Sequence, residues 1–306
     1  MSTEMSRRTM VKLAAGALCA GGSLTAAAEE QQQAGAEDAL DVWQRETDLV
    51  SAGTYGKYRQ DGKTRSLASL EKLEMSFEKV FREAREVKVE DKPAVWSVYN
   101  MGYVVKTREA LFSIDLVHRR APELAPYLDF ELVTHNHADH FHKELYQAMD
   151  GAGKTVISNF LDNYGTRNWK KDGGYTRAVK TFKIKDVEIR TSLIDHNEYL
   201  IDFTTAFEIR YGDFILYHTG DSGRGTEPKL GTVWGKPDLW LFFPGCGIDV
   251  AAATRKVEAK RIVFGHLWEL GHKTGRLTTP MVRRALVNAE PACKAVSAAL
   301  WGDRVL

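Results

Sequence analysis

The chain has 306 residues, of which 43% are hydrophobic and 27% are charged, and this composition is typical of a globular protein with one large core or two modest ones. Its net charge of +1 at pH 7 excludes the strongly basic balance expected of a protein that binds nucleic acid or an anionic membrane surface. We therefore expect a small-molecule substrate and no nucleic-acid partner.

Residues 1–28 have the features of an export signal. Two adjacent arginines, Arg7 and Arg8, precede a mild apolar run over residues 13–24, and three alanines at 26–28 supply a small-residue cleavage site. The arginine pair resembles the twin-arginine class of signals, although an ordinary helix with two arginines is an alternative. We expect cleavage near Ala28 by way of the twin-arginine export machinery, and a periplasmic or secreted product. No later apolar run is long enough to span a membrane.

Residues 29–91 are expected to form a polar tail and a helical extension. The tail covers about residues 29–37, which are polar and low in complexity. Apolar residues then recur at helical spacing over residues 37–50. The pattern is clearer over residues 67–85, where Leu70, Leu73 and Phe77 lie three or four positions apart. These helices could cover the core, form an oligomer surface or build a wall of a binding site.

Beyond residue 92 the pattern changes to short segments rich in Val, Tyr, Trp, Phe and Ile. Residues 94–105 and 109–115, with a break near Gly102, predict consecutive antiparallel strands. Further strands are expected at 130–134, 154–158, 180–184, 187–194, 202–211, 214–218, 239–243 and 261–264, and helices at 122–127, 143–149, 249–257 and 280–288. Two successive blocks of this kind predict an α+β sandwich with two sheets inside and helices outside. A polar segment over 159–177 is expected to be a surface loop or a lid.

The segment over residues 134–140 reads Thr-His-Asn-His-Ala-Asp-His and directly follows a predicted strand. Because side chains at positions i and i+2 of an extended segment point to the same side, His135 and His137 could hold one metal ion together. A turn after them would direct Asp139 and His140 toward a second ion. Imidazole and carboxylate are ligand types that Zn²⁺, Fe and Mn accept. The sequence therefore predicts a metal site here rather than a polar loop.

Further ligands must come from distant strand ends, because one loop cannot coordinate two ions. Three candidates, His196, Asp221 and His266, each lie just past a predicted apolar strand. Side chains in such positions can meet across one edge of a sheet. Asp115, at the end of another predicted strand, is a fourth acidic or imidazole side chain in this kind of position.

The order of these residues resembles the metallo-β-lactamase-fold hydrolase superfamily: His-x-His-x-Asp-His at 135–140, then a lone His, a Gly-Asp pair and a final His. The match covers roughly residues 94–290. It implies a four-layer αββα sandwich over residues 92–306 with a dinuclear site at one sheet edge. The ligands implied for one ion are His135, His137 and His196, and those for the other are Asp139, His140 and His266. Asp221 would bridge the two ions, and Asp115 would orient the histidine-rich loop.

The resemblance implies a hydrolase with two divalent ions, Zn²⁺ or alternatively Mn²⁺ or Fe²⁺, and with catalytic roles for Asp139 and Asp221. A hydroxide held between the ions would attack a lactone, an ester or a phosphoester. A carboxylate at Asp221 disfavours β-lactam cleavage. Residues 215–222 and 263–266 look most like the branch related to L-ascorbate-6-phosphate lactonase, from which the export signal and the helical N-terminus depart. An iron-dependent oxidoreductase on the same fold and an exported, non-catalytic metal-binding protein are the alternatives.

The remaining candidates lie around this set. His272, six residues after His266, could contact substrate. His142 and His218 are expected to face solvent or to lie beside the ligands. Neither Ser222 nor Cys246 is expected to be a nucleophile, because a metal-activated water makes one unnecessary.

Three cysteines occur in the chain, and Cys246 and Cys293 would remain after signal cleavage. Neither belongs to a metal-type pair such as Cys-x-x-Cys. An oxidising compartment permits a disulfide between them, and two separate buried thiols are the alternative.

Overall fold

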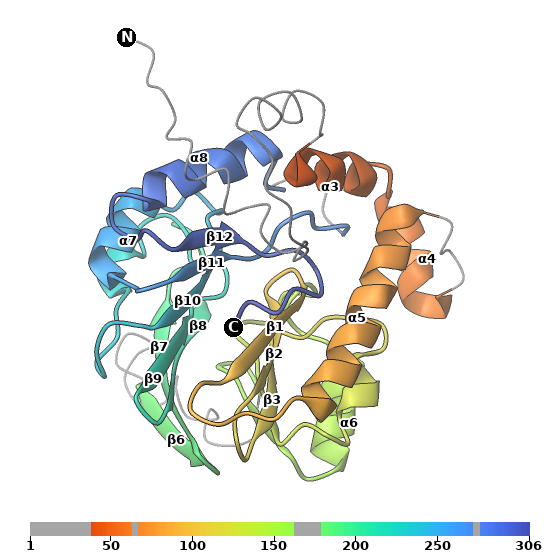
Figure 1. The fold of residues 1–306 in the computed structure, drawn as a ribbon, viewed down its shortest axis with the longest axis horizontal. Coiled ribbons are helices and arrows are strands. Elements are labelled where there is room, and N and C mark those ends of the chain that lie inside the picture. The colour runs from red at the N-terminus through yellow and green to blue at the C-terminus, as the bar shows by residue number, and fades with distance from the viewer. Residues whose placement is uncertain (1–37, 63–66, 162–178, 272–275) are drawn as a thin grey trace, which may run out of the picture.

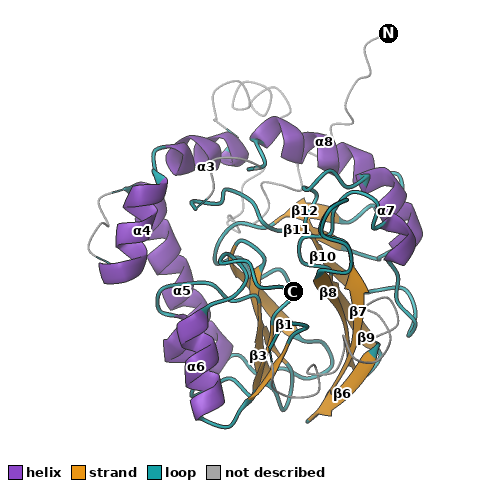
Figure 2. Ribbon diagram, turned by 180° about the vertical axis from the view of Figure 1, so that it is seen from behind, coloured by secondary structure: helices purple, strands orange, loops and turns teal. Residues whose placement is uncertain are grey.

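A computed structural model describes residues 38–62, 67–161, 179–271 and 276–306 of this chain. Two β-sheets face each other in the middle of the molecule, and helices lie on their outer faces (Figure 1). The view from behind shows the same order of layers (Figure 2). This confirms the predicted αββα sandwich. The predicted export signal and polar tail lie outside the described residues.

The first sheet has the strand order β1-β2-β3-β4-β5. Its strands are β1 (Ala94–Tyr99), β2 (Gly102–Lys106), β3 (Leu111–Ile114), β4 (Phe130–Leu132) and β5 (Thr155–Ile157). The pairs β1–β2 and β2–β3 are antiparallel, as predicted, whereas β3, β4 and β5 run parallel. The carboxyl ends of β3 and β4 therefore open at the same edge of this sheet.

The second sheet has the order β12-β11-β10-β9-β8-β7-β6. Its strands are β6 (Lys180–Ile184), β7 (Val187–Ile194), β8 (Thr204–Tyr211), β9 (Phe214–His218), β10 (Leu239–Phe242), β11 (Ile262–Phe264) and β12 (Val296–Ala298). Strands β6 to β9 form an antiparallel meander, and β9 to β12 are parallel. Because β7 runs in the same direction as β9, the carboxyl ends of β7, β9, β10 and β11 share one edge.

The helices are α3 (Ala39–Asp48), α4 (Ala52–Asp61), α5 (Ala68–Glu86), α6 (Lys143–Gly151), α7 (Val250–Val257) and α8 (Thr279–Ala289), with short 3₁₀ turns η1 (Ala121–Leu124) and η3 (Glu227–Lys229). Helices α5 and α6 cover the first sheet, whereas α7 and α8 cover the second (Figure 1). Helix α5 buries Leu70, Leu73, Phe77 and Val80 on one face against β1 and β2, as the helical spacing predicted. No helix in the described part of the chain is both long and apolar enough to span a membrane.

Two elements were not expected from the sequence. Helix α4 contains Gly53 and Gly56, which weaken its helical pattern, and the ends rather than the interior define it. Its Ser51 side chain accepts a hydrogen bond from the backbone N–H of Thr54, and Gly62 ends it in a left-handed conformation. The side chains of strand β12 are only half-buried, so the sequence has no apolar run there that would predict a strand.

The free edge of β1 is covered by residues 303–306. Val95 exchanges backbone hydrogen bonds with this segment, and the N–H of Ser97 donates to the carbonyl of Asp303 at 2.9 Å. An isolated bridge between Trp96 and Arg304 belongs to the same pairing. The covering segment satisfies backbone groups that would otherwise offer an edge for pairing with another chain.

Candidate metal centre

The structure brings the seven predicted ligand side chains together, although they come from four separate parts of the chain. His135, His137, Asp139 and His140 lie in the loop that follows β4. The other three side chains follow β7, β9 and β11, whose carboxyl ends share one edge. Their residues are His196, Asp221 and His266. The carboxyl ends of strands from both sheets therefore meet at this site.

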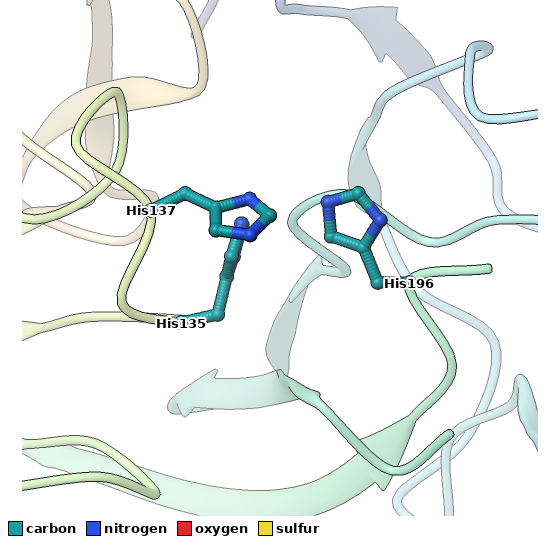
Figure 3. A group of neighbouring side chains, drawn as sticks. All are labelled: His135, His137 and His196. Atoms are coloured by element: carbon teal, nitrogen blue, oxygen red, sulfur yellow. The ribbon is translucent and has the colours of Figure 1, made fainter. Parts of the chain in front are cut away.

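One group of ligand atoms consists of three imidazoles. Those of His135, His137 and His196 lie within 4.8 Å of one another. Figure 3 shows His135 and His137 on one loop pointing toward His196 on the opposite loop. The ring of Phe203 lies 5.2 Å from that of His137 and 6.0 Å from that of His196, so an aromatic side chain forms one wall of this group.

The second group contains two carboxylates and two imidazoles. Ligand atoms of Asp139, His140, Asp221 and His266 also lie within 4.8 Å of one another. His140 Nε2 is 3.0 Å from Asp221 Oδ1, and His266 Nε2 is 3.0 Å from Asp139 Oδ2. Asp221 Oδ2 lies 3.5 Å from His196 Nε2, so this carboxylate reaches both groups.

A tight turn positions the two halves of the motif. The backbone N–H groups of His140 and Phe141 both donate to the carbonyl of His137, at 3.0 and 2.8 Å. This turn reverses the chain directly after the extended segment, and it directs Asp139 and His140 toward the second group. Helix α6 begins immediately afterwards, where His142 Nδ1 accepts a hydrogen bond from the N–H of Leu145 at 3.2 Å.

Asp115 fixes the orientation of this loop. Its Oδ1 accepts from the backbone N–H of Thr134, and its Oδ2 accepts from Thr134 Oγ1, both at 2.7 Å. The same Oδ2 lies 2.8 Å from His140 Nδ1. The Thr134 hydroxyl has one proton, which it donates to Asp115. Toward His135 Nδ1, 2.9 Å away, it therefore acts as the acceptor. Both imidazoles then carry their proton on Nδ1 and direct Nε2 into the centre.

The loop that carries His196 is fixed by a lysine. Lys229 Nζ, from η3, lies 2.6 Å from Asp195 Oδ1 and 2.6 Å from Asp202 Oδ1. The N–H of Asp202 donates to Asp195 Oδ1 at 2.8 Å, so the two ends of the loop are joined. Sequence reasoning did not single out Lys229, because an isolated lysine in a polar segment gives no sign of its buried partners.

Gly220 allows the two sheets to approach. Its φ is +47°, and a Cβ placed on it would lie 2.7 Å from Thr134 Oγ1. Sterics explain why a glycine precedes Asp221: only glycine fits against the first-sheet loop at this position, and the next residue, Asp221, then reaches into the centre. Carbonyls of the β1–β2 turn complete the contact: that of Asn100 accepts from the N–H of His266 at 2.9 Å, and that of Met101 lies 3.2 Å from His218 Nε2.

The electrostatics of the centre divide its histidines into two types. Burial lowers the pKa of His135 well below its usual value, so this imidazole is neutral. Burial opposes protonation of His140 as well, but the carboxylates of Asp221, Asp139 and Asp115 raise its pKa well above the usual value. The pKa of His266 is raised to about 9 by Asp221 and Asp139 against the effect of burial.

The donor atoms fit metal ions. Nε2 of His135, His140 and His196 and Oδ1 of Asp221 are buried and make no hydrogen bond of good geometry among the described residues, although His140 Nε2 and Asp221 Oδ1 lie 3.0 Å apart. Buried polar atoms are nearly always satisfied, so four such atoms converging on one region indicate a missing partner. A divalent cation satisfies neutral imidazole nitrogens and carboxylate oxygens together, and this donor set suits zinc, iron or manganese.

The remaining residues considered in the sequence analysis lie in different places relative to the centre. His272 lies outside the described residues, so its expected substrate contact stays a prediction. His142 and His218 are both buried rather than facing solvent, the first as the cap of α6 and the second against the β1–β2 turn. The two described cysteines are free thiols. Sequence reasoning gave Thr134 no role of its own, although it lies in the predicted motif, two residues after β4.

No protein-family model matches the sequence, and no curated protein matches it either. Solved structures do match. Igni18, a novel metallo hydrolase from the archaeon Ignicoccus hospitalis, has a TM-score of 0.52 and 16% sequence identity, with 69% of this chain and 96% of that chain covered. A possible metal-dependent hydrolase from Veillonella parvula has a TM-score of 0.51 and 12% identity, with 70% and 98% covered.

A third match is YhfI from Bacillus subtilis, a metallo-β-lactamase-fold protein, with a TM-score of 0.49, 17% identity and coverage of 69% and 98%. At these identities the two matches with TM-scores above 0.5 concern the fold and not the reaction. The layer order, the strand order and the positions of the seven side chains at the strand ends agree with the resemblance seen in the sequence. This chain has the metallo-β-lactamase fold.

Proposed function

We propose that this protein is an exported hydrolase that uses two divalent metal ions to cleave a lactone, an ester or a phosphoester. The observation that carries the proposal is the convergence of five imidazoles and two carboxylates from loops of both sheets. Export is supported by the Arg7-Arg8 pair and the short apolar run after it.

The two groups of donor atoms define which residues would hold which ion. His135, His137 and His196 would bind one, and Asp139, His140 and His266 the other, with Asp221 in reach of both. When bound, a pair of divalent ions supplies a water of lowered pKa at neutral pH and polarises the electrophilic oxygen of the substrate.

The residues of this chain support attack by water rather than by a side chain. Burial, with help from Asp221 and Asp139, raises the pKa of the Cys246 thiol to about 12, so it is not a thiolate nucleophile at neutral pH. Ser222 is fully buried, and its hydroxyl donates to Thr219 Oγ1 at 3.3 Å. Neither group is therefore prepared to attack a substrate.

Asp139 is the residue best placed to accept a proton from the attacking water. Although burial opposes ionisation, His140 and His266 lower its pKa well below the usual value, so it is a carboxylate at neutral pH. Its side chain is 11% exposed, against 6% for that of Asp221. Asp139 is thus the more accessible of the two carboxylates and can exchange a proton with solvent.

The test is an activity screen of the protein loaded with Zn²⁺ or Mn²⁺ against lactones, carboxylic esters and phosphoesters. We expect turnover in at least one class, and we expect Asp221→Ala to lower the metal content and remove most of that turnover. His142→Asn is the matched control, because asparagine can also cap α6 and the residue lies outside both groups of donor atoms.

Two outcomes would contradict the proposal. Oxygen consumption by iron-loaded protein, without turnover of any ester, would favour an iron-dependent oxidoreductase, since imidazole and carboxylate suit iron too. A loaded protein that is inert across the whole panel would favour a non-catalytic metal-binding protein. Unchanged metal content and rate in Asp221→Ala would contradict the role given to that carboxylate.

A further inference from the structure

Strand β10 ends at the edge of the metal centre without contributing a ligand to the set described above. Strand β10 lies between β9 and β11 and is parallel to both. Its carboxyl end therefore opens at the same edge as the ends that lead to Asp221 and His266. The loop that follows it carries Cys246.

The sulfur of Cys246 faces two of the ligands. Its Sγ and the ligand atoms of His196 and Asp221 lie within 4.8 Å of one another. His196 is 8% exposed and Asp221 is 4% exposed. In the described structure, His196 Nε2 has no hydrogen-bond partner, and Asp221 Oδ1 makes no hydrogen bond of good geometry although it lies 3.0 Å from His140 Nε2. The thiol therefore lies beside two buried side chains that can act as metal ligands.

Backbone contacts hold the Cys246 loop in this position. The N–H of Arg224 donates to the carbonyl of Cys246, and the N–H of Gly223 donates to the carbonyl of Asp195, both at 3.0 Å. A Cβ at Gly223 would lie 1.8 Å from the carbonyl oxygen of His196 and 3.0 Å from Cys246 Cβ. The loops after β7, β9 and β10 thus pack together at Gly223, and these contacts fix the backbone and Cβ of Cys246.

We propose that Cys246 is a further metal-binding residue, which with His196 and Asp221 offers a nitrogen, oxygen and sulfur set to a thiophilic divalent cation such as Zn²⁺, Co²⁺ or Cd²⁺. This inference rests on the proposed metal centre, which includes His196 and Asp221. Binding exchanges the S–H bond for a metal–sulfur bond and releases one proton to solvent, with no change of oxidation state. Because Mn²⁺ and Mg²⁺ prefer oxygen ligands, the sulfur biases this centre toward zinc.

Cobalt substitution tests the proposal directly, because a cobalt–thiolate bond gives a charge-transfer absorption that imidazole and carboxylate ligands do not. The full-length protein is used in a Cys19→Ser background, so that the N-terminal cysteine cannot contribute. We expect the absorption in this protein and its loss in Cys246→Ser. Cys293→Ser is the matched control, since Cys293 is buried beside the carbonyls of Lys260 and Ala295 and should leave the absorption unchanged.

Metal preference gives a second measurement. In chelator competition, Cys246→Ser should lower the ratio of zinc to manganese affinity by at least about ten-fold, the lower end of the loss seen when groups around metal ligands are changed. A ratio that does not change would overturn the proposed bias toward zinc.

Alkylation provides a readout that needs no variant. Cys246 is partly buried and burial raises the pKa of its thiol, so iodoacetamide at alkaline pH should label it in metal-free protein, and Zn²⁺ should slow that labelling without affecting Cys293. Peptide mass spectrometry separates the sites. Equal labelling of Cys246 with and without zinc, or cobalt absorption that survives Cys246→Ser, would overturn the proposal.

The failure of this inference is distinguishable from failure of the proposed function. Ester turnover by zinc-loaded protein whose cobalt form lacks the thiolate absorption would leave the hydrolase standing and overturn the sulfur ligand. Thiolate absorption in a protein that turns over no ester or phosphoester would support the ligand and contradict the hydrolase.

Discussion

The two sheets hold their shares of the metal centre with side chains of opposite charge. On the first sheet the carboxylate anchor, Asp115, is fully buried and contacts Thr134 and His140. On the second sheet the ammonium anchor, Lys229, has a side chain that is 28% exposed and joins Asp195 to Asp202.

The difference in burial determines what each anchor contributes. Removal of a buried carboxylate leaves its donors unsatisfied where water cannot replace it, whereas water can reach the partners of a partly exposed ammonium. The carboxylate anchor also contacts a predicted ligand directly, whereas the ammonium anchor acts through the backbone of the His196 loop. The first sheet should therefore be the more sensitive half of the centre.

The largest effect is expected for Asp115→Ala. It leaves the N–H of Thr134 and Nδ1 of His140 buried without their acceptor, so the free energy of unfolding should fall by about 3 kcal/mol or more. Metal affinity should fall by about 10–100-fold. Urea unfolding and chelator competition measure the two effects.

The control for Asp115→Ala is Asp238→Asn, which changes another strand-end carboxylate that accepts a backbone hydrogen bond, from the N–H of Ile215. It lies at the opposite end of the parallel strands and should leave metal affinity unchanged. Equal metal affinity in Asp115→Ala and in the unmodified protein would break the comparison between the two anchors.

A smaller effect is expected for Lys229→Met, which removes the ammonium and keeps much of the apolar stem. The His196 loop loses the ion pairs that join its ends, so affinity for the ion bound by the three-imidazole group should fall by about ten-fold. Stability should fall by only about 1 kcal/mol, because solvent screens this partly exposed group. Lys229→Arg should restore most of the affinity, and a loss larger than that of Asp115→Ala would reverse the order of the anchors.

Gly220→Ala tests the contact at which the two halves meet. The added Cβ meets Thr134, and the backbone is left-handed, so a cost of about 2–4 kcal/mol follows from overpacking and strain together. Gly212→Ala is the matched control: its φ is +55°, but a Cβ there would meet nothing within 4 Å. It should cost only about 1 kcal/mol. Identical melting temperatures for the two variants would show that the approach of the sheets is not tight.

The last prediction is a pH dependence of the metal-free protein. The pKa of His266 is raised to about 9, so its protonation stabilises the fold fully below about pH 6.5, and this contribution is lost as pH rises through about 9. After metal removal, the melting temperature should therefore fall over this range. The slope should be smaller in zinc-loaded protein, in which the ion replaces the proton. A flat profile in metal-free protein would contradict the assignment, and His266→Gln should reduce the slope, with His140 accounting for what remains.

The anchor on the first sheet could be predicted from the sequence far better than the anchor on the second, although the ligand candidates of both sheets were predicted. Residues 134–140 are contiguous, so periodicity and the turn after the strand were enough to pair His135 with His137 and to direct His140 toward a second ion beside them. Asp115 was noticed because it ends an apolar strand. The predicted strands and helices also agree with most of the observed elements, because buried strands and amphipathic helices are determined by local apolar spacing.

The features that the sequence did not predict depend on contacts between segments that are far apart in the chain. Lys229 acts only through Asp195 and Asp202, and the loop position of Cys246 depends on β10 lying between β9 and β11. No local pattern records which strand lies beside which. Parallel pairing of β3 with β4, and of β9 with β10, was likewise invisible in the sequence, because burial on both faces removes the alternation that distinguishes strand types.

The turn between β1 and β2, whose carbonyls receive His266 and lie beside His218, has a consequence for cooperativity. His266 is held by backbone from the other sheet, so neither half of the sandwich can complete its own share of the centre in isolation. If the polypeptide were divided between residues 161 and 179, the two fragments should be able to reassociate, and metal should strengthen their reassociation by acting as a cross-link.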